Sequence, residues 1–330
     1  MKVRNFQRHR TMKETLLLAT RLPPAFLAVL RERFEVLGPI APPFHTGASA
    51  LPVADLARIR AIVSIGSVPM PADSLGLFPK LGLICCLGTG FEGVPLTAAR
   101  ERGIAITHSP NANGSAVADL AIGLMLASMR NFAVARDYLR AGKFEGNAGV
   151  RLSAEHGLAG RRLGVYGLGA IGLKIARRAA AFEMEIAYHN RKPRTDVDYT
   201  WQPTLAALAQ WCDVLMVAVR ADASNRRAVD QSVLRALGPE GFVVNISRGS
   251  VVDEEALVAA LESGTICGAG LDVYEREPRV TPALFDLPHV ALTPHIGGNT
   301  HDAQRAMHAL VLANLEAFFA GRAVPNPVPA

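Results

Sequence analysis

The sequence predicts an α/β protein of two domains, each built on a parallel sheet covered by helices. Three observations indicate this class: a length of 330 residues, short apolar segments alternating with helical patterns, and a second start of that alternation near residue 161. A chain of this length is too long for one average domain and fits two. Half of the residues are hydrophobic, which is typical of a compact globular protein.

Charge and cysteine content exclude several classes of function. Lysine and arginine number 35 against 29 acidic residues, but the charges are dispersed and aromatic residues are few, so we expect no nucleic-acid partner. The positive balance suits small anionic ligands and equally an ordinary soluble surface. The four cysteines form no CxxC pair and have no histidine at ligand spacing. We therefore expect no metal site, no disulfide and a reducing cytoplasmic location. No apolar run reaches membrane-spanning length, so no membrane partner is expected.

The first βα alternation runs from the start of the chain to about residue 107. Its opening eleven residues are expected to be a poorly ordered extension. The strand and helix candidates that follow are "TLLLAT", "AFLAVLRERF", "ADLARIRAIVSIG", "LGLICCLGTGF" and "PLTAARERGIAITHSP". This rhythm predicts a parallel sheet with helices on its faces.

Residues 115–144 are expected to form one long helix. The segment reads "SAVADLAIGLMLASMRNFAVARDYLRAGKF", and its first half is apolar on nearly every face. Such a pattern favours a helix packed between two bodies, hence an interdomain helix.

The second alternation contains the shortest and most apolar segments. After "RRLGVYGLGAIGLKIARRAAAF", the strand candidates are "EIAYHN", "DVLMVAV", "GFVVNIS", "GAGLDVY" and "HVALTP". Strands of this composition are covered on both faces, as in a doubly wound sheet. The helical pattern "THDAQRAMHALVLANLEAFFAG" follows the sheet, and a proline-rich tail is expected to be extended.

A glycine pattern marks a candidate dinucleotide site. "GVYGLGAIG" places Gly167, Gly169 and Gly172 in GxGxxG spacing, directly after a strand and before a helix. The glycines permit a tight turn and close approach of the backbone to a pyrophosphate, and the helix N-terminus offers free N–H groups. Ala170 and Ile171 complete the predicted turn.

The end of the next strand indicates which dinucleotide is bound. An NAD site usually has an acidic residue there, whereas this chain has Asn190, Arg191 and Lys192, with Arg194 nearby. A guanidinium grips phosphate through two hydrogen bonds, so we expect NADPH, with Arg191 as the main contact and NADH as a weaker alternative. The competing interpretation is a solvated basic loop.

Three later strand ends carry polar residues that suit reduction of a 2-oxo acid. Arg248, Glu277 and His295 follow separate strands, together with Asp272, and ligands of a parallel sheet bind beyond such ends. A hydride arriving at a ketone leaves negative charge on oxygen, which calls for a proton donor and a fixed cation. His295 is the candidate donor, oriented by Glu277, and Arg248 is the candidate for the substrate carboxylate. Taken singly, each has a structural alternative, such as pairing of Glu277 with a neighbouring arginine.

Several segments resemble the D-isomer-specific 2-hydroxyacid dehydrogenase family. They are "LGTGFEGV", "GIAITHSPNANGSAVADLAIGLMLA", "GLGAIG", "NISRGSVVDEEAL", "GAGLDVYEREP" and "TPHIGGNT", in order and at family spacing. Within the family, "VADLAIGL", "VRAD" and the non-acidic strand end are similar to the NADPH-dependent glyoxylate, hydroxypyruvate and hydroxyphenylpyruvate reductases.

The resemblance implies roles for further residues. Arg248, Glu277 and His295 would be the catalytic arginine, acid and histidine. Asp272 would contact the nicotinamide carboxamide, with Val219, Ile246 and Gly297 nearby. The substrate would be held at Ser64, Ile65, Gly66, Ser67, Leu87 and Gly88, in addition to Arg248 and His295.

The resemblance also implies two similar Rossmann-like or flavodoxin-like domains with a cleft between them. The substrate domain would comprise residues 1–107 and 299–330, and the dinucleotide domain residues 108–298. Family members form homodimers through the cofactor domain. Two alternatives remain at this stage: an NAD-dependent dehydrogenase of another D-2-hydroxy acid, such as lactate or 3-phosphoglycerate, and a non-catalytic NAD(P)-sensing protein.

Overall fold

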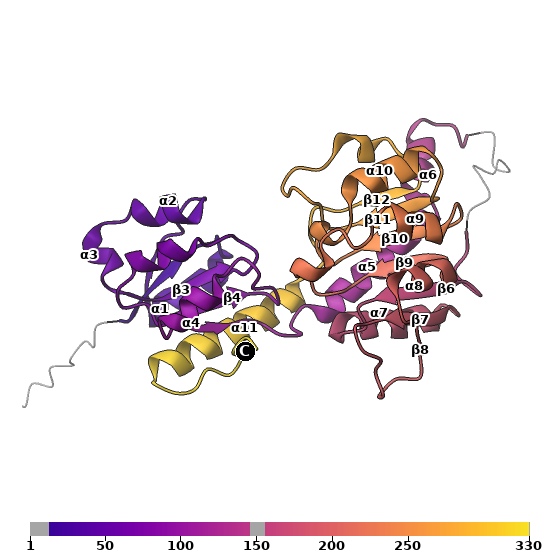
Figure 1. The fold of residues 1–330 in the computed structure, drawn as a ribbon. Coiled ribbons are helices and arrows are strands. Elements are labelled where there is room, and N and C mark those ends of the chain that lie inside the picture. Colours follow the sequence, from indigo (N-terminus) through magenta and orange to yellow (C-terminus); the bar gives the residue numbers. More distant parts are fainter. Residues whose placement is uncertain (1–12, 146–155, 330) are drawn as a thin grey trace, which may run out of the picture. The chain divides into compact units, whose positions relative to one another are not determined.

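The computed structural model describes residues 13–145 and 156–329 (Figure 1). The chain divides into two compact units, one formed by Met1–Ala112 with Gln304–Ala330 and the other by Asn113–Ala303. The two boundaries between the units fall after residues 112 and 303. Each lies five residues later in the chain than the boundary expected from the sequence, after residue 107 or 298. The extension expected at residues 1–11 lies outside the described part.

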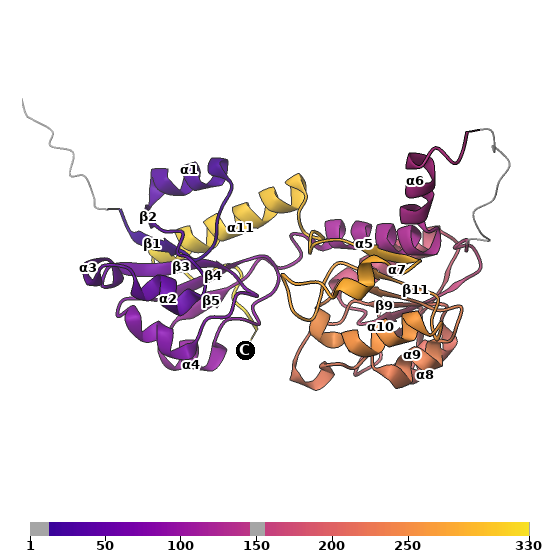
Figure 2. The ribbon, with the colours of Figure 1, turned by 90° about the horizontal axis from the view of Figure 1, so that it is seen from above.

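The first unit is a five-stranded parallel sheet in the order β2-β1-β3-β4-β5, a doubly wound arrangement. Its strands are β1 (Thr15–Leu18), β2 (Glu35–Leu37), β3 (Ile59–Ile65), β4 (Leu83–Leu87) and β5 (Ala105–Thr107). Helices α1 (Pro24–Arg33) and α11 (His301–Phe319) cover one face. The other face carries α2 (Phe44–Ser49), α3 (Val53–Leu56), η1 (Ala72–Leu77) and α4 (Leu96–Glu101) (Figure 2).

The second unit is a seven-stranded parallel sheet in the order β12-β11-β10-β9-β6-β7-β8. Its strands are β6 (Arg162–Tyr166), β7 (Glu185–His189), β8 (Thr200–Trp201), β9 (Val214–Val217), β10 (Phe242–Asn245), β11 (Gly268–Leu271) and β12 (Val290–Leu292). Counted from β6, this is the strand order 3-2-1-4-5-6-7, and the order reverses between β6 and β9. The expected α/β class with parallel sheets is therefore confirmed.

Helices cover both faces of the second sheet. α5 (Gly114–Met129) and α7 (Ala170–Ala181) lie on one face, and α8 (Leu205–Trp211), α9 (Gln231–Leu237) and α10 (Glu254–Glu262) lie on the other (Figure 2). Short 3₁₀ turns η2 (Ala223–Asn225), η3 (Gly249–Val251) and η4 (Pro282–Phe285) occupy the connections after β9, β10 and β11.

The prediction of a single helix over residues 115–144 is wrong. Two helices, α5 and α6 (Phe132–Arg140), replace it and bend by 61° at the break. Asn131 between them has a left-handed φ of 48°, a conformation that asparagine tolerates better than most residues. The apolar surface of α5 is covered by α7 and by β10 to β12, all within the second unit. In the described residues no single helix is long and apolar enough to cross a membrane.

Candidate active site

The glycine turn lies where the strand order of the second sheet reverses. Gly167 follows β6 with a φ of +99°, and a Cβ there would lie 2.4 Å from the Cα of Val219 beyond β9. A Cβ on Gly172 would lie 2.2 Å from the carbonyl oxygen of Gly167. On Gly169 it would meet nothing within 4 Å. Gly167 and Gly172 therefore close the turn, and Gly169 borders open space.

This geometry fits the pyrophosphate of a dinucleotide. Gly169 is the N-cap of α7, no side chain caps that helix end, and Ala170 and Ile171 form its first turn. The uncapped N–H groups and the positive end of the helix dipole favour an anion there. The structure thus brings together all the turn residues predicted from the sequence.

Two side chains after β7 fasten this turn. Asn190 accepts a hydrogen bond on Oδ1 from the backbone N–H of Leu168, with 2.8 Å between the atoms. Arg194 donates from Nη1 to the carbonyl oxygen of Leu168 at 2.7 Å and also pairs with Asp196. Sequence reasoning treated Asn190 only as the replacement of an acid and Arg194 only as a cation, and it missed this structural role of both.

Arg191 and Lys192 are exposed in the same loop. The Ser224 hydroxyl holds the pKa of Asp222 below its ordinary value, and Arg191 adds to that effect. Burial raises the pKa of Tyr166 at the end of β6, and Arg191 opposes this rise. Arg191 directly follows Asn190, which binds the Leu168 N–H, so it belongs to the loop beside the glycine turn.

The three predicted catalytic residues follow neighbouring strands, Arg248 after β10, Glu277 after β11 and His295 after β12. Nδ1 of His295 lies 2.7 Å from Oε2 of Glu277. Oε1 of Glu277 accepts a hydrogen bond from the backbone N–H of Tyr274 at 3.1 Å. The charge of Arg248 acts on both members of this pair. The structure therefore gathers all three residues at one edge of the sheet.

The hydrogen bond between Glu277 and His295 shifts the pKa of each partner. For His295, this bond raises the pKa, and it outweighs the opposing effects of burial and of Arg248. For Glu277, burial alone would raise the pKa, but the bonds from His295 and from the Tyr274 N–H reverse the direction and lower it. The pair is thus a carboxylate beside an imidazole that holds its proton more tightly than usual.

Asp272 holds the loop that carries His295. Its side chain is buried, with a relative exposure of 2%, and it accepts hydrogen bonds from the backbone N–H groups of Ile296 at 2.8 Å and Gly297 at 2.9 Å. Thr293 donates its hydroxyl to the same carboxylate at 2.6 Å. His295 itself has a left-handed φ of 52°. The carboxylate therefore stabilises an unusual backbone conformation at the candidate proton donor.

The remaining predicted cofactor residues lie around the same edge of the second sheet. Ile246 is buried directly after β10, and Ser247 beside it donates its hydroxyl to the carbonyl oxygen of Val219. A Cβ on Gly297 would lie 2.9 Å from Oδ2 of Asp272, so a larger residue there would force that carboxylate to shift.

Apart from Arg248 and His295, the predicted substrate residues belong to the first unit. Ile65 and Leu87 pair across β3 and β4, which brings the segments 64–67 and 87–88 side by side. Ser64 is buried, whereas Ile65 and Ser67 are exposed. Gly66 packs so closely that a Cβ there would lie 1.8 Å from the carbonyl oxygen of Gly90. Gly88 has a φ of +100°.

Comparison with known proteins adds a family match over the second unit. The family model described as D-isomer specific 2-hydroxyacid dehydrogenase, NAD binding domain, matches residues 122–297. A glyoxylate/hydroxypyruvate reductase of Arabidopsis thaliana is 40% identical over 270 residues, which cover 82% of this chain and 85% of that protein. A hydroxyphenylpyruvate reductase of Plectranthus scutellarioides is 38% identical over the same shares.

Solved structures extend the similarity to almost the whole chain. The NADPH-dependent glyoxylate/hydroxypyruvate reductase of Sinorhizobium meliloti in complex with citrate is 40% identical, with a TM-score of 0.87 and coverage of 96% of this chain and 97% of that one. The same enzyme in complex with NADP and malonate is 39% identical, with the same TM-score and coverage.

Proposed function

The chain belongs to the D-isomer-specific 2-hydroxyacid dehydrogenase family, and from that premise we propose that it reduces a small 2-oxo acid to the D-2-hydroxy acid with NADPH. The single observation that carries this proposal is the hydrogen-bonded pair of His295 and Glu277, 2.7 Å apart, on the strand ends next to that of Arg248. A protein that only senses a nucleotide needs no proton donor of this kind.

Each of the three residues has a distinct task in this reaction. NADPH, when bound, supplies a hydride to the carbonyl carbon. The imidazolium of His295 donates the proton on Nε2 to the carbonyl oxygen, so that a hydroxyl is formed. Glu277 stays ionised and accepts the Nδ1–H, which fixes the ring and raises the pKa of His295, so that the imidazolium is favoured. Arg248 binds the substrate carboxylate through its two-pronged guanidinium.

We propose NADPH over NADH because of the residues after β7. No carboxylate stands at the strand end, where it would repel a 2′-phosphate, and Arg191 and Lys192 are exposed beside the glycine turn. A relative of 39% identity is named NADPH-dependent and has been solved with NADP. The backbone amides of residues 64–67 are proposed to hold the substrate carboxylate, and Leu87 and Gly88 are proposed to line the pocket.

The test is NADPH oxidation followed by absorbance with glyoxylate, hydroxypyruvate and hydroxyphenylpyruvate in turn. We expect turnover with at least one of these acids and a clearly higher kcat/KM with NADPH than with NADH. Equal efficiency with both cofactors would contradict the assignment of Arg191. The absence of turnover with every acid, while NADPH still binds, would favour the sensing protein instead.

We also propose that the protein is a homodimer joined through the second unit. No residue of α6 is buried, and Phe132, Val134 and Leu139 on it are among the exposed large hydrophobic residues. Phe132 also lines a groove of about 380 Å³ that extends to the edge strand β12. A second copy would cover this surface across a twofold axis. Sedimentation velocity should give a dimer that Leu139→Glu dissociates, and a monomeric wild-type protein would refute the proposal.

A further inference from the structure

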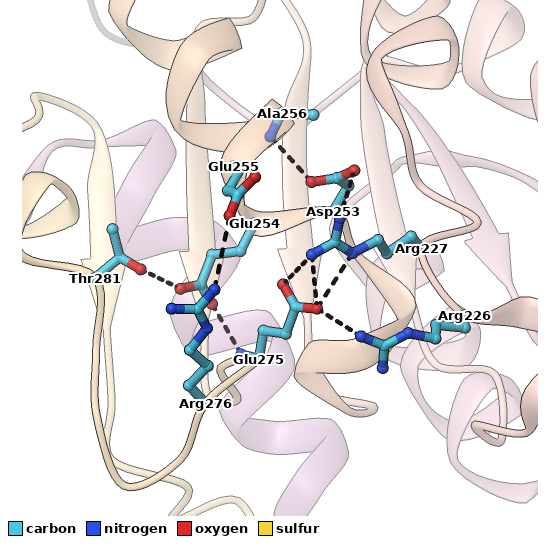
Figure 3. Close-up of polar contacts among 9 residues, drawn as sticks. All are labelled: Arg226, Arg227, Asp253, Glu254, Glu255, Ala256, Glu275, Arg276 and Thr281. Atoms are coloured by element: carbon cyan, nitrogen blue, oxygen red, sulfur yellow. Dashed lines mark hydrogen bonds and ion pairs between the residues drawn. The ribbon is translucent and has the colours of Figure 1, made fainter.

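A cluster of charged residues joins the loops that follow β9 and β11 with the start of α10 (Figure 3). Its centre is Glu275, whose side chain is only 9% exposed. Arg227 reaches Glu275 through two nitrogens, with Nη2 at 3.0 Å and Nε at 3.2 Å from Oε1. Arg226 donates to the same oxygen at 3.0 Å. The reaction proposed above uses none of these side chains.

Glu254 fixes the backbone of the same loop from the other side. It is the first residue of α10, it is 7% exposed, and its Oε2 accepts the backbone N–H of Glu275 at 2.9 Å. Its other oxygen accepts the hydroxyl of Thr281. This carboxylate therefore joins both ends of the segment that contains Glu277, with Glu275 before it and Thr281 after it.

Arg227 ties in the two neighbouring loops. Its backbone N–H donates to the carbonyl oxygen of Ser250 at 2.7 Å, in the η3 turn that follows Arg248. Its φ of 51° is left-handed, a conformation that costs energy for an arginine and persists only when surrounding contacts impose it. Its Nη1 lies 3.6 Å from Oδ2 of Asp253, the N-cap of α10.

The loop carrying Arg248 and the loop carrying Glu277 also touch directly. A Cβ placed on Gly249 would lie 1.9 Å from the carbonyl carbon of Tyr274 and 2.3 Å from the nitrogen of Glu275. The backbone beside Arg248 thus packs on the peptide that Glu254 and Glu275 hold in place. Tyr274 in turn donates its N–H to Glu277.

We propose that the ion pair of Arg227 with Glu275, backed by Glu254, positions Glu277 against His295. Arg227 and Glu275 are positioning residues, because they touch neither the reacting atoms nor His295. The ion pair joins the loops after β9 and β11, and the Arg227 backbone N–H binds the loop after β10. Glu277 is two residues from the acidic member of the pair. The proposal deepens the function proposed above and rests on it for its catalytic meaning. The geometric claim is tested separately.

The pKa of His295 is the most direct measure of this positioning. Glu277, Arg248 and Asp272 are the charged groups that act on His295, and the bond from Glu277 is the largest influence. In Arg227→Gln, direct electrostatics would raise this pKa, because a cation is removed. Displacement of Glu277 would lower it, because the bond that raises the pKa is lost. The direction in which the His295 pKa changes therefore shows whether Glu277 has been displaced or only a nearby positive charge has been removed.

The experiment is an NMR titration of ¹³C-labelled histidine in the protein without substrate or cofactor, with the His295 signal assigned from its loss in His295→Gln. We expect the pKa of His295 to fall in Arg227→Gln and to recover partly in Arg227→Lys. Arg276→Gln is the matched control, because it removes the same charge from a residue next to Glu277. Its side chain is 76% exposed, and it should cause no fall.

A second variant covers the case in which Arg227→Gln leaves a buried carboxylate that unfolds the protein. Arg227→Gln with Glu275→Gln removes one charge of each sign, so its direct effect on His295 nearly cancels. The same fall of the pKa is expected. A pKa that is unchanged or raised in folded Arg227→Gln, or unchanged in the folded double variant, overturns the proposal.

Turnover provides the second readout. We expect kcat in Arg227→Gln to fall about 10- to 100-fold, because small displacements of a catalytic group have effects of that size. The loss of activity with rising pH should begin at a lower pH than in the wild type. If the His295 pKa falls in Arg227→Gln but the protein reduces no 2-oxo acid, the proposed function is wrong and the positioning role stands. If Arg227→Gln has normal turnover and an unchanged His295 pKa, the positioning role is wrong and the proposed function stands.

Discussion

His295 is held at its ring and along its backbone. Its ring bonds to Glu277, its own N–H donates to the carbonyl oxygen of Asp272 at 2.9 Å, and the Asp272 carboxylate binds the next two N–H groups. A left-handed residue on an otherwise free loop would relax to a more favourable conformation. These contacts therefore present Nε2 in one orientation, as a proton donor requires.

The protonation of His295 predicts the pH dependence of the reduction. Its pKa lies above the ordinary value of about 6.5, so the donor form persists to a higher pH than in an ordinary histidine and is lost as pH rises through the raised pKa. In Glu277→Gln the bond to an ionised partner is gone, and the alkaline limb of kcat/KM should move to lower pH. Steady-state rates across pH 5 to 10 check this. An alkaline limb at the same pH in both proteins would show that another group donates the proton.

Arg191 predicts the cofactor preference at the same scale. Replacing it by alanine removes a guanidinium that can bind a 2′-phosphate, so KM for NADPH should rise about 10-fold or more while KM for NADH changes little. Kinetics with both cofactors measure the effect. Arg194→Ala is the informative comparison, because Arg194 holds the Leu168 carbonyl at 2.7 Å and its loss should weaken both cofactors alike.

At the scale of elements, the contact of η3 with the segment after β11 depends on Gly249, because a residue with a side chain does not fit there. Gly249→Ala would place a methyl group 1.9 Å from the Tyr274 carbonyl carbon. We expect it to lower the free energy of unfolding by about 1–3 kcal/mol, as overpacking does. Gly123→Ala in the middle of α5 meets nothing within 4 Å and should instead stabilise by about 0.5–1 kcal/mol. Thermal unfolding of both variants tests the contrast, and equal Tm shifts would contradict it.

The sequence predicted the central buried strands well and local breaks poorly. "DVLMVAV" and "GFVVNIS" are apolar on both faces because helices cover both sides of β9 and β10, and that pattern is visible in one dimension. β2 has three residues and β8 has two, too few to show a period, and both were missed. The break at Asn131 was missed because a left-handed residue leaves the apolar pattern on either side unchanged.

At the scale of the molecule, the order of the strands determines which site residues could be predicted from the sequence. β10, β11 and β12 are consecutive in the chain and adjacent in the sheet, so residues after their ends could be predicted to meet. The cluster of Arg227, Glu254 and Glu275 could not be predicted, because its members follow different elements and read as ordinary surface charge. "VDEEAL" served only as a family marker, yet Asp253 caps α10 and Glu254 holds a neighbouring loop.

The most direct test of the account is a single turnover of the preformed complex with NADPH. Mixed with hydroxypyruvate, the wild-type protein should oxidise its bound cofactor. His295→Gln should bind NADPH with similar affinity, measured by its fluorescence, and oxidise it at least 100-fold more slowly, since its side chain is a far weaker proton donor. Oxidation at the wild-type rate in His295→Gln would contradict the central claim that this imidazole protonates the substrate.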